Sequence, residues 1–409
     1  MEPKQEDTLH VAVVFERLGP YHLARLAALA KRARVTAIEI VRKDKLYQWD
    51  VVDSPCGFKR VTLFNDEAYS SADLVKRLCE ELDGLRPDAV AIPSWGRPAS
   101  WTTFRWALQS RTATVLMTES QFRDAPRVAW KEYIKRQMVA YCGAGLVGGQ
   151  RQIDYMVRLG MEKSRVFTGY DVVENDYFSA GADQARVHAK RLREELKLPE
   201  KYFLTSSRFV PKKNIVGLLT SYSMYRKNGA PGDWKLVVLG DGPTRPEVER
   251  CISDQNLEGH VLLPGFKQYA DLPVYYGLGG AFVLASSTEQ WGLVVNEAMA
   301  AGLPVLISEA CGCAPDLVKD GVNGFVFDYR NPNALAEYMR KLASGECDLS
   351  AMANASRTIV ADYTPESYAE GFMRAARTAR GNIPASTIGQ FVAGKVAGMM
   401  IKMAQKEGE

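Results

Sequence analysis

The chain has 409 residues, of which 46% are hydrophobic and 24% are charged, and 52 Lys and Arg against 48 Asp and Glu give a net charge of +4. This composition excludes a disordered chain, a collagen and a small disulfide scaffold, and the nearly balanced charge does not indicate a nucleic-acid binder. The length predicts two or three domains.

The cysteines and the N-terminus indicate a cytoplasmic protein. The seven cysteines are scattered and include no C-x-x-C pair, which predicts reduced thiols and no metal site. Cys311 and Cys313 flank a glycine, but two thiols without further ligands make a poor zinc site, so both are expected in a loop. The first residues, MEPKQEDT, are polar, unlike a signal peptide, and no apolar run is long enough to span a membrane.

Short apolar runs alternate with longer amphipathic stretches, which is the pattern of α/β units with parallel sheets. In the first half, strands are expected at His10–Phe15, Val35–Val41, Arg60–Phe64, Ala89–Pro93, Ala113–Thr118 and Gly145–Gly148. Helices are expected at Tyr21–Ala33, Arg127–Tyr141 and Gln150–Leu159. The periodicity is lost over Tyr170–Ala182, which predicts a linker.

The second half repeats the alternation. Strands are expected at Tyr202–Ser207, Lys235–Leu239, His260–Leu263, Ala281–Ala285, Pro304–Ser308 and Gly324–Phe327, and helices at Ala185–Leu196, Asn214–Lys227, Gly292–Ala301, Pro332–Ala343 and from Pro365 onward, with a break at Gly381–Pro384. The pattern predicts two Rossmann-like, doubly wound domains, residues 1–175 and 176–380, facing each other across a cleft. A terminal helix at 381–409 is expected to pack back on the first domain. Because open α/β sheets bind ligands at the carboxyl ends of their strands, the cleft is the expected site.

The most informative segment is Ser286–Asp328, SSTEQWGLVVNEAMAAGLPVLISEACGCAPDLVKDGVNGFVFD. Glu289 lies in the loop after an expected strand, and Glu297 lies inside the following helix. The amides of Gly292–Val294 stand at the helix N-terminus, where unpaired N–H groups and the helix dipole favour an anion. An anion cradle between two carboxylates suits a ligand with a phosphate in the middle and hydroxyls at each end.

In this context the segment resembles the retaining nucleotide-sugar glycosyltransferases of family 4, which have the two-domain GT-B fold and an E-x7-E signature. The matching positions are Glu289, Trp291, Gly292, Leu293, Val294, Glu297, Ala298, Ala300, Gly302, Pro304 and Val305, and the downstream D-G-x-N-G is Asp320, Gly321, Asn323 and Gly324. The resemblance is strong over residues 200–345 and much weaker over the first 170.

Further elements of that family stand upstream. Arg208 and Lys213 look like its R-x4-K element, which binds the diphosphate; Arg208 is expected to end a strand and Lys213 to open a helix. A planar guanidinium and a compact ammonium suit a pyrophosphate leaving group. Leu239–Pro243 resembles the family's G-x-G-P turn, and the loop Leu263–Phe266 resembles the one that meets the nucleobase, which makes Phe266 a candidate donor contact.

The resemblance implies transfer of a sugar from a nucleoside-diphosphate sugar, with UDP as the expected nucleotide, to a hydroxyl acceptor with retention of anomeric configuration, in glycan or glycoconjugate biosynthesis. It implies that Glu289 binds the donor sugar's hydroxyls and Glu297 the ribose hydroxyls. Arg208, Lys213 and the backbone at Leu293–Val294 would stabilise charge on the departing diphosphate. These cations and the lack of a D-x-D motif predict a metal-independent reaction, in which the leaving phosphate helps to deprotonate the acceptor.

The N-terminal half is the expected acceptor side. Gly19 follows the first strand, where the family places a glycine-containing loop against the donor phosphate, although a Gly-Pro turn explains it equally well. Glu119 stands where many members have a histidine near the donor sugar. The alternative is a helix cap by Thr118 or Ser120 with a solvated Glu119.

Three more residues are candidates on the acceptor side. His22 could act as a general base or contact the acceptor, although a lone histidine is more often structural. Trp95 and Arg97 follow another expected strand, so that Trp95 could stack on a sugar and Arg97 could meet an anionic acceptor. Packing of Trp95 in the core explains it equally well.

A basic and aromatic run covers residues 123–138. At helical spacing it is amphipathic, and it either contacts an anionic membrane, as in some family members with lipid acceptors, or forms a solvated face with a core stripe, which is the preferred interpretation. The stretch Phe391–Met403 is similar and is expected to pack as the terminal helix. The expected location is the cytoplasm, with the inner face of the membrane as an alternative.

Two other functions stay open as hypotheses. A nucleotide-sugar epimerase or hydrolase on the same fold would need acid and base residues around the sugar in place of an acceptor pocket. A non-catalytic nucleotide-sugar-binding partner protein would tolerate loss of a motif residue, and none is lost in the second domain. The expected partners are a nucleotide sugar and a hydroxyl acceptor, namely a glycan, glycolipid or small molecule, and no nucleic acid.

Overall fold

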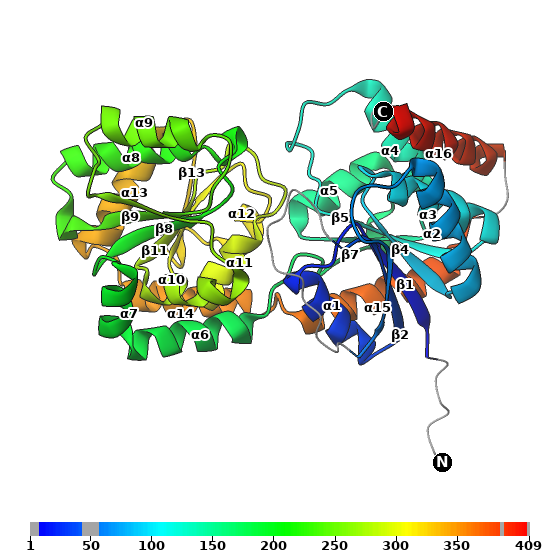
Figure 1. The fold of residues 1–409 in the computed structure, drawn as a ribbon, viewed down its shortest axis with the longest axis horizontal. Helices are drawn as coiled ribbons and strands as arrows, with labels where there is room; N and C mark the ends of the chain where they lie inside the picture. Colours follow the sequence, from blue (N-terminus) through cyan, green and yellow to red (C-terminus); the bar gives the residue numbers. More distant parts are fainter. Residues whose placement is uncertain (1–7, 43–56, 385–387, 407–409) are drawn as a thin grey trace, which may run out of the picture. The chain divides into compact units, whose positions relative to one another are not determined.

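The computed structural model describes residues 8–42, 57–384 and 388–406; the polar N-terminal residues 1–7 and Cys56 lie outside these ranges. Contacts divide the chain into two units, each with its own sheet and helices, which are labelled in Figure 1. Unit 1 contains the described residues up to 122, then 126–172 and 365 onward, and unit 2 contains 123–125 and 173–364. The division falls before the expected boundary at 380, because the helix over Pro365–Gly381 belongs to unit 1.

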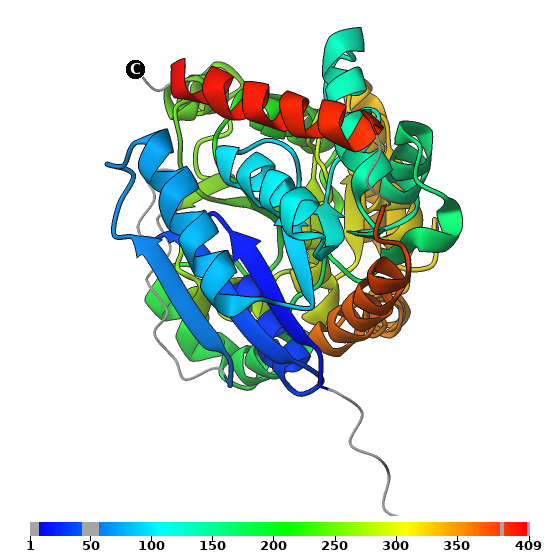
Figure 2. The ribbon, with the colours of Figure 1, turned by 90° about the vertical axis from the view of Figure 1, so that its right-hand side faces the viewer.

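Unit 1 is built on a seven-stranded parallel sheet with the order β3-β2-β1-β4-β5-β6-β7. Its strands are β1 (His10–Phe15), β2 (Arg34–Val41), β3 (Lys59–Phe64), β4 (Ala89–Pro93), β5 (Ala113–Thr118), β6 (Ala144–Val147) and β7 (Val166–Thr168). Its helices are α1 (Pro20–Ala30), α2 (Ser71–Leu85), α3 (Pro98–Ser110), α4 (Ala129–Tyr141), α5 (Gln150–Leu159), the 3₁₀ turn η1 (Lys163–Arg165), α15 (Pro365–Gly381) and α16 (Ile388–Lys406). Because crossovers between parallel strands are right-handed, α1 lies on one face of the sheet and α2 to α5 lie on the other. Helix α15 packs beside α1, and α16 lies across α2, α3 and α4 as an outer layer (Figure 2).

Unit 2 is built on a six-stranded parallel sheet with the order β10-β9-β8-β11-β12-β13. Its strands are β8 (Tyr202–Ser206), β9 (Lys235–Leu239), β10 (Val261–Gly265), β11 (Ala281–Leu284), β12 (Val305–Ser308) and β13 (Gly324–Phe327). Its helices are α6 (Asn175–Val187), α7 (Ala189–Leu196), α8 (Ile215–Lys227), α9 (Arg245–Asp254), α10 (Leu272–Leu278), α11 (Leu293–Ala300), α12 (Ala314–Leu317), α13 (Pro332–Ser344) and α14 (Leu349–Val360), with 3₁₀ turns η2 (Pro211–Lys213), η3 (Pro231–Asp233) and η4 (Tyr269–Asp271). By the same handedness, α8 and α9 cover one face and α10 and α11 the other.

The strand order reverses once in each sheet, between β1 and β4 in unit 1 and between β8 and β11 in unit 2. The connections that leave two such neighbouring strands run to opposite faces of the sheet. They therefore separate at its carboxyl edge, which is where open α/β sheets bind ligands. The inner strands of each sheet are buried on both faces, as all six residues of β1 show, and this is why they read as continuous apolar runs.

The linker expected over Tyr170–Ala182 is wrong in its second part, because α6 begins at Asn175. A Cβ on Gly181 would lie 2.6 Å from Pro273 of α10, and a Cβ on Gly277 would lie 2.6 Å from the carbonyl oxygen of Ala182. The two helices thus pack at very short range through small residues. Glycine and alanine give no strong apolar periodicity, so this helix is hard to predict from the pattern.

Candidate functional site

Lys213 and Glu289 form an ion pair where the strand order of unit 2 reverses. Lys213 is the last residue of η2, just before α8 rather than inside it, and Glu289 lies in the loop between β11 and α11. The side chains are 14% and 12% exposed, so the pair is largely buried and still reaches solvent. Two sequence candidates that are 76 residues apart are therefore brought together at the carboxyl edge of the sheet.

Backbone hydrogen bonds hold the Glu289 loop from both sides. The amide of Ser287 donates to the carbonyl of Lys212 at 2.8 Å, which ties this loop to η2. The amide of Gly312 donates to the carbonyl of Glu289 at 3.1 Å, next to the buried Cys311 and Cys313. The cysteine-containing loop is thus a support for the Glu289 backbone, a role that the sequence did not reveal.

Helix α11 starts at Leu293, shortly after Glu289 in the sequence. Gly292 is the residue before the helix and has φ +110° and ψ 64°, a left-handed conformation that favours glycine. Leu293 and Val294 are half-buried and begin the helix. The preceding Trp291 is fully buried, and its Nε1 donates to the Asn296 side chain at 2.9 Å. The indole therefore anchors the turn from which α11 starts, where the first N–H groups of a helix have no partner within the helix.

Glu297 lies deeper than the other candidates. Its side chain is fully buried, and the hydroxyl of Tyr276 on α10 donates to its carboxylate at 2.6 Å. Tyr276 is itself fully buried, so this hydrogen bond is shielded from water. Sequence reasoning did not identify Tyr276, because nothing in its local pattern distinguishes it from a core aromatic residue.

Arg208 is exposed on the loop after β8, and a glycine turn holds the backbone of that loop. The amide of Phe209 donates to the carbonyl of Asp241 at 2.8 Å, and the amide of Ser207 donates to the carbonyl of Leu239 at 3.0 Å. Gly240, at the end of β9, has φ +125°, and a Cβ there would lie 1.8 Å from the carbonyl oxygen of Ser207. The two backbones approach so closely that only glycine fits.

Phe266 lies on the next loop along this edge of the sheet. It follows β10 directly and is half-buried. The amide of Gly240 donates to the carbonyl of Gly265 at 3.0 Å, so the loop that bears Phe266 is tied to the glycine turn and through it to the Arg208 loop.

In unit 1, His22 caps the start of α1. The amide of Gly19 donates to Nδ1 of His22 at 3.1 Å, and the imidazole packs 4.4 Å from the Phe15 ring. Burial, with a smaller contribution from Arg25, lowers the pKa of His22 to about 3. A neutral ring with this pKa is a weak general base at neutral pH, and its observed contacts are structural.

A buried carboxylate accepts a hydrogen bond from the loop that contains Gly19. Glu39 of β2 is fully buried, and it accepts a hydrogen bond from the amide of Leu18 at 2.8 Å. Its other oxygen pairs with Arg60 at 2.8 Å and accepts from Thr62 at 3.0 Å. The pattern had predicted only a strand here, because the partner residues lie on β3 and are brought close by the sheet.

Glu119 follows β5 and lies beside Asp171, which follows β7. Asp171 is fully buried. Burial, the neighbouring Glu119 charge and a hydrogen bond between the two side chains together raise the pKa of Asp171 well above its usual value, against the opposing effect of Arg25. No helix begins at Thr118, whose hydroxyl instead accepts from the Ser120 amide at 3.1 Å. Glu119 is therefore a charged neighbour that helps to raise the pKa of the buried Asp171.

Replacing Asp171 with asparagine is expected to stabilise unit 1 at neutral and alkaline pH. A carboxyl with a raised pKa binds more protons in the folded state, so stability falls as the pH rises from the unfolded-state value through the folded-state value. The melting temperature should rise by roughly 2–4 °C at about pH 8 and change little at about pH 4. Thermal unfolding across this range measures the change, with the exposed Asp254→Asn as the control. An equal gain at both pH values would contradict the raised pKa of Asp171.

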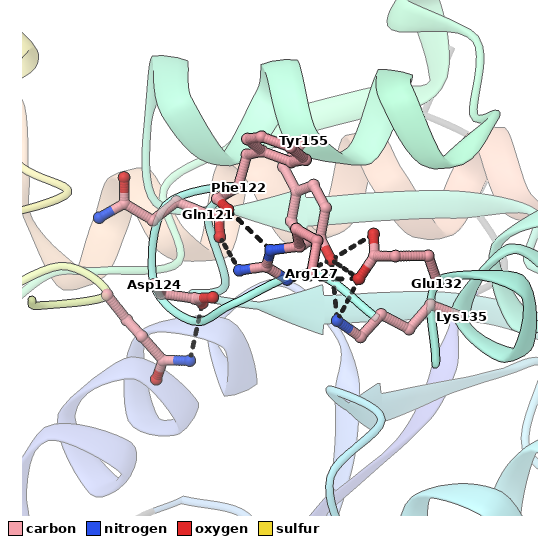
Figure 3. A network of polar contacts seen from close by, with 8 residues as sticks. Gln121, Phe122, Asp124, Arg127, Glu132, Lys135 and Tyr155 are labelled. Atoms are coloured by element: carbon pink, nitrogen blue, oxygen red, sulfur yellow. Dashed lines mark hydrogen bonds and ion pairs between the residues drawn. The ribbon is translucent and has the colours of Figure 1, made fainter. Parts of the chain in front are cut away.

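Trp95 and part of the basic run are joined by internal contacts. The Trp95 ring lies edge-on to Tyr155 at 6.0 Å, and Lys135 lies over it at 5.4 Å. Arg127 and Lys135 both donate to the Tyr155 hydroxyl, at 2.7 and 2.8 Å, and both pair with Glu132 (Figure 3). These two cations therefore serve the fold of unit 1 and do not form an outward-facing basic surface.

Arg97 is exposed and precedes α3. No helix in the described ranges is long and apolar enough to cross a membrane. Among the same residues, no group of three or more His, Cys, Asp or Glu could hold a metal ion.

Comparison with known proteins finds a family match within unit 2. Residues 188–359 match the family model described as glycosyl transferases group 1. The chain is 24% identical over 269 residues to the alpha-monoglucosyldiacylglycerol synthase of Acholeplasma laidlawii, a match that covers 62% of this chain and 66% of that protein. The chain thus spans slightly less than two thirds of the length of this relative. These matches show that the chain is similar to the group 1 glycosyltransferases.

Solved structures confirm the expected fold class. A glycosyltransferase from Rickettsia africae has a TM-score of 0.71 at 14% identity and covers 91% of this chain and 99% of its own. HepE from Anabaena, solved in complex with UDP, has a TM-score of 0.69 at 15% identity, with 90% and 98% covered. Together with the two Rossmann-like parallel sheets, these neighbours identify the fold as GT-B.

Proposed function

We propose that the chain is a retaining glycosyltransferase that transfers a sugar from a UDP-sugar to a hydroxyl acceptor without a metal ion. The observation that carries the proposal is the Lys213–Glu289 pair beside the start of α11, at the reversal point of the unit 2 sheet. One cation, one carboxylate and a row of helix amides there match what a sugar diphosphate needs. The group 1 match over residues 188–359 and the UDP complex of HepE support the same assignment.

In this mechanism, side chains and backbone amides of unit 2 stabilise the negative charge of the departing diphosphate. Lys213 and Arg208 supply positive charge, and the amides at Leu293 and Val294 donate hydrogen bonds to the phosphate oxygens. Glu289 binds the donor sugar's hydroxyls and fixes the ring for attack. The acceptor hydroxyl attacks the anomeric carbon on the face that the diphosphate leaves, its proton passes to a phosphate oxygen, and the configuration is retained.

The first test is a thermal-shift panel with UDP, GDP and ADP and their common sugars, in the presence of EDTA. A ligand that binds only the folded protein raises its melting temperature. UDP and a UDP-sugar should each give a clear shift, and proton NMR of the product formed with an acceptor should show the donor's anomeric configuration. A shift with no nucleotide in a folded sample, or an epimerised free sugar as product, would reject the proposal.

Replacing Glu297 with glutamine should mainly weaken nucleotide binding. A hydrogen bond to a charged group contributes about 1.5–3 kcal/mol, so the Kd for UDP should rise by roughly 10- to 100-fold while kcat at saturating donor changes much less. Glutamine can still accept from Tyr276, which preserves the buried contact. Calorimetry measures the change, with the exposed Glu258→Gln as the matched control. An unchanged Kd would remove Glu297 from the nucleotide site.

A further inference from the structure

Helix α16 has two different faces. Ala393, Ala397 and Ile401 recur every four residues, are buried, and join a core cluster with Trp101 and Phe104 of α3. This stripe accounts for the attachment of α16 to unit 1.

The outward face of the same helix carries large apolar side chains. Phe391 is 66% exposed, Met399 is 45% exposed and Met403 is 39% exposed. These positions lie eight and four residues apart, so they share one side of the helix. Three large apolar side chains in a row are not needed to attach α16 and point to an apolar partner.

Cations surround these apolar side chains. A groove of about 960 Å³ runs between α16 and α3, and Lys395 and Lys402 line one wall while Arg105 and Arg111 line the other. Among the residues that the structure describes, no carboxylate lines the groove. The Lys395 ammonium lies over the Phe391 ring, 5.0 Å from its centre, so a cation contacts this exposed aromatic side chain directly. Gly394 and Gly398 also line the groove and contribute no side chains to it.

We infer that this α16–α3 face docks on a membrane surface rich in anionic phospholipid. Apolar side chains flanked by lysine and arginine are the composition of helices that lie in a bilayer interface, with the aliphatic stems in the apolar layer and the charges at the phosphates. Four cations on one face repel a second copy of the same face, which disfavours a symmetric dimer here. The inference concerns unit 1 alone and does not depend on the proposed transfer reaction.

Sedimentation of the full chain with vesicles, without any sugar nucleotide, tests the inference. Binding to vesicles of phosphatidylglycerol mixed with phosphatidylcholine should be strong at about 0.1 M salt and weak at about 0.5 M, because the Debye length shortens. Vesicles of phosphatidylcholine alone should bind much less. Equal binding to both lipids, or none to the anionic vesicles, would overturn the inference.

Two sets of variants locate the surface. Lys395→Glu with Lys402→Glu should lower the affinity for anionic vesicles at least about tenfold, because each basic residue near such a surface contributes a several-fold gain. Phe391→Ala with Met399→Ala should also weaken binding and should leave the fold intact, since both side chains are exposed. The control is Lys190→Glu with Lys201→Glu, two exposed lysines of unit 2. A control as defective as the first pair, unchanged binding by either α16 pair, or a dimer in solution that the α16 changes dissociate, would overturn the inference.

Discussion

Replacing Glu289 with glutamine is expected to lower kcat by about 100-fold or more, with a much smaller change in the KM for the donor. The substitution keeps the shape of the side chain and its ability to accept a hydrogen bond from Lys213. It removes the negative charge that pairs with Lys213 and that, in the proposed mechanism, binds the sugar hydroxyls. The loss therefore falls on the transition state more than on the bound ground state.

Steady-state kinetics and thermal unfolding of the same samples separate this effect from misfolding. The pair is largely buried at 14% and 12% exposure, so some stability is lost, but glutamine leaves no bare acceptor in the protein. Glu309→Gln is the matched control, because Glu309 lies in the loop after β12 and pairs with the exposed Arg330 at 3.1 Å. A Glu289→Gln enzyme as active as the wild type would refute the site assignment.

Replacing Gly240 with alanine is expected to lower the free energy of unfolding of unit 2 by more than about 3 kcal/mol. The new Cβ would stand 1.8 Å from the carbonyl oxygen of Ser207, and the backbone φ of +125° is strained for any side chain. The two loops must separate to relieve the overlap. Their hydrogen bonds, including that from Phe209 to Asp241, would then be lost.

Denaturant unfolding measures the effect, and Gly259→Ala isolates its cause. Gly259 has φ +73°, but a Cβ there meets nothing within 4 Å. It should therefore show the conformational cost alone, about 1–2 kcal/mol. Similar losses for the two variants would mean that the close approach of the Gly240 and Ser207 backbones is unimportant. If the Arg208 loop serves the donor, Gly240→Ala should also lose its thermal shift with UDP.

Local pattern was enough to predict most of the sheet. Each expected strand lies within two residues of an observed one, because strands of a parallel sheet are continuous apolar runs such as His10–Phe15. The edge strand β7, with only three partly buried residues, gave no comparable signal. Helices α2, α3, α9, α10, α12 and α14 were also missed. Helix α3, for example, is largely buried and carries threonine, serine and tryptophan where an amphipathic helix would alternate.

Only the part of the candidate site that lies within one continuous segment was predictable from the sequence. Glu289 and Gly292 stand in a contiguous motif, and the resemblance connected that motif to Lys213. The pairing of Glu119 with Asp171, and of Glu297 with Tyr276, depends on residues from other strands and helices. No local pattern marks such partners, because the sheet order decides which loops meet at its edge.

The return of the chain to unit 1 has a consequence for the order in which the protein is made. Apart from residues 123–125, unit 2 is one continuous stretch, whereas unit 1 needs α15 to cover one face of its sheet. Tyr368 and Phe372 of α15 are fully buried, and Gly371 lies so close to β7 that a Cβ would stand 2.1 Å from the Thr168 carbonyl oxygen. On the ribosome, unit 2 can fold as soon as it emerges, while the first 172 residues wait with an uncovered apolar face for the last helices. The part of the chain that is synthesised first is therefore completed last.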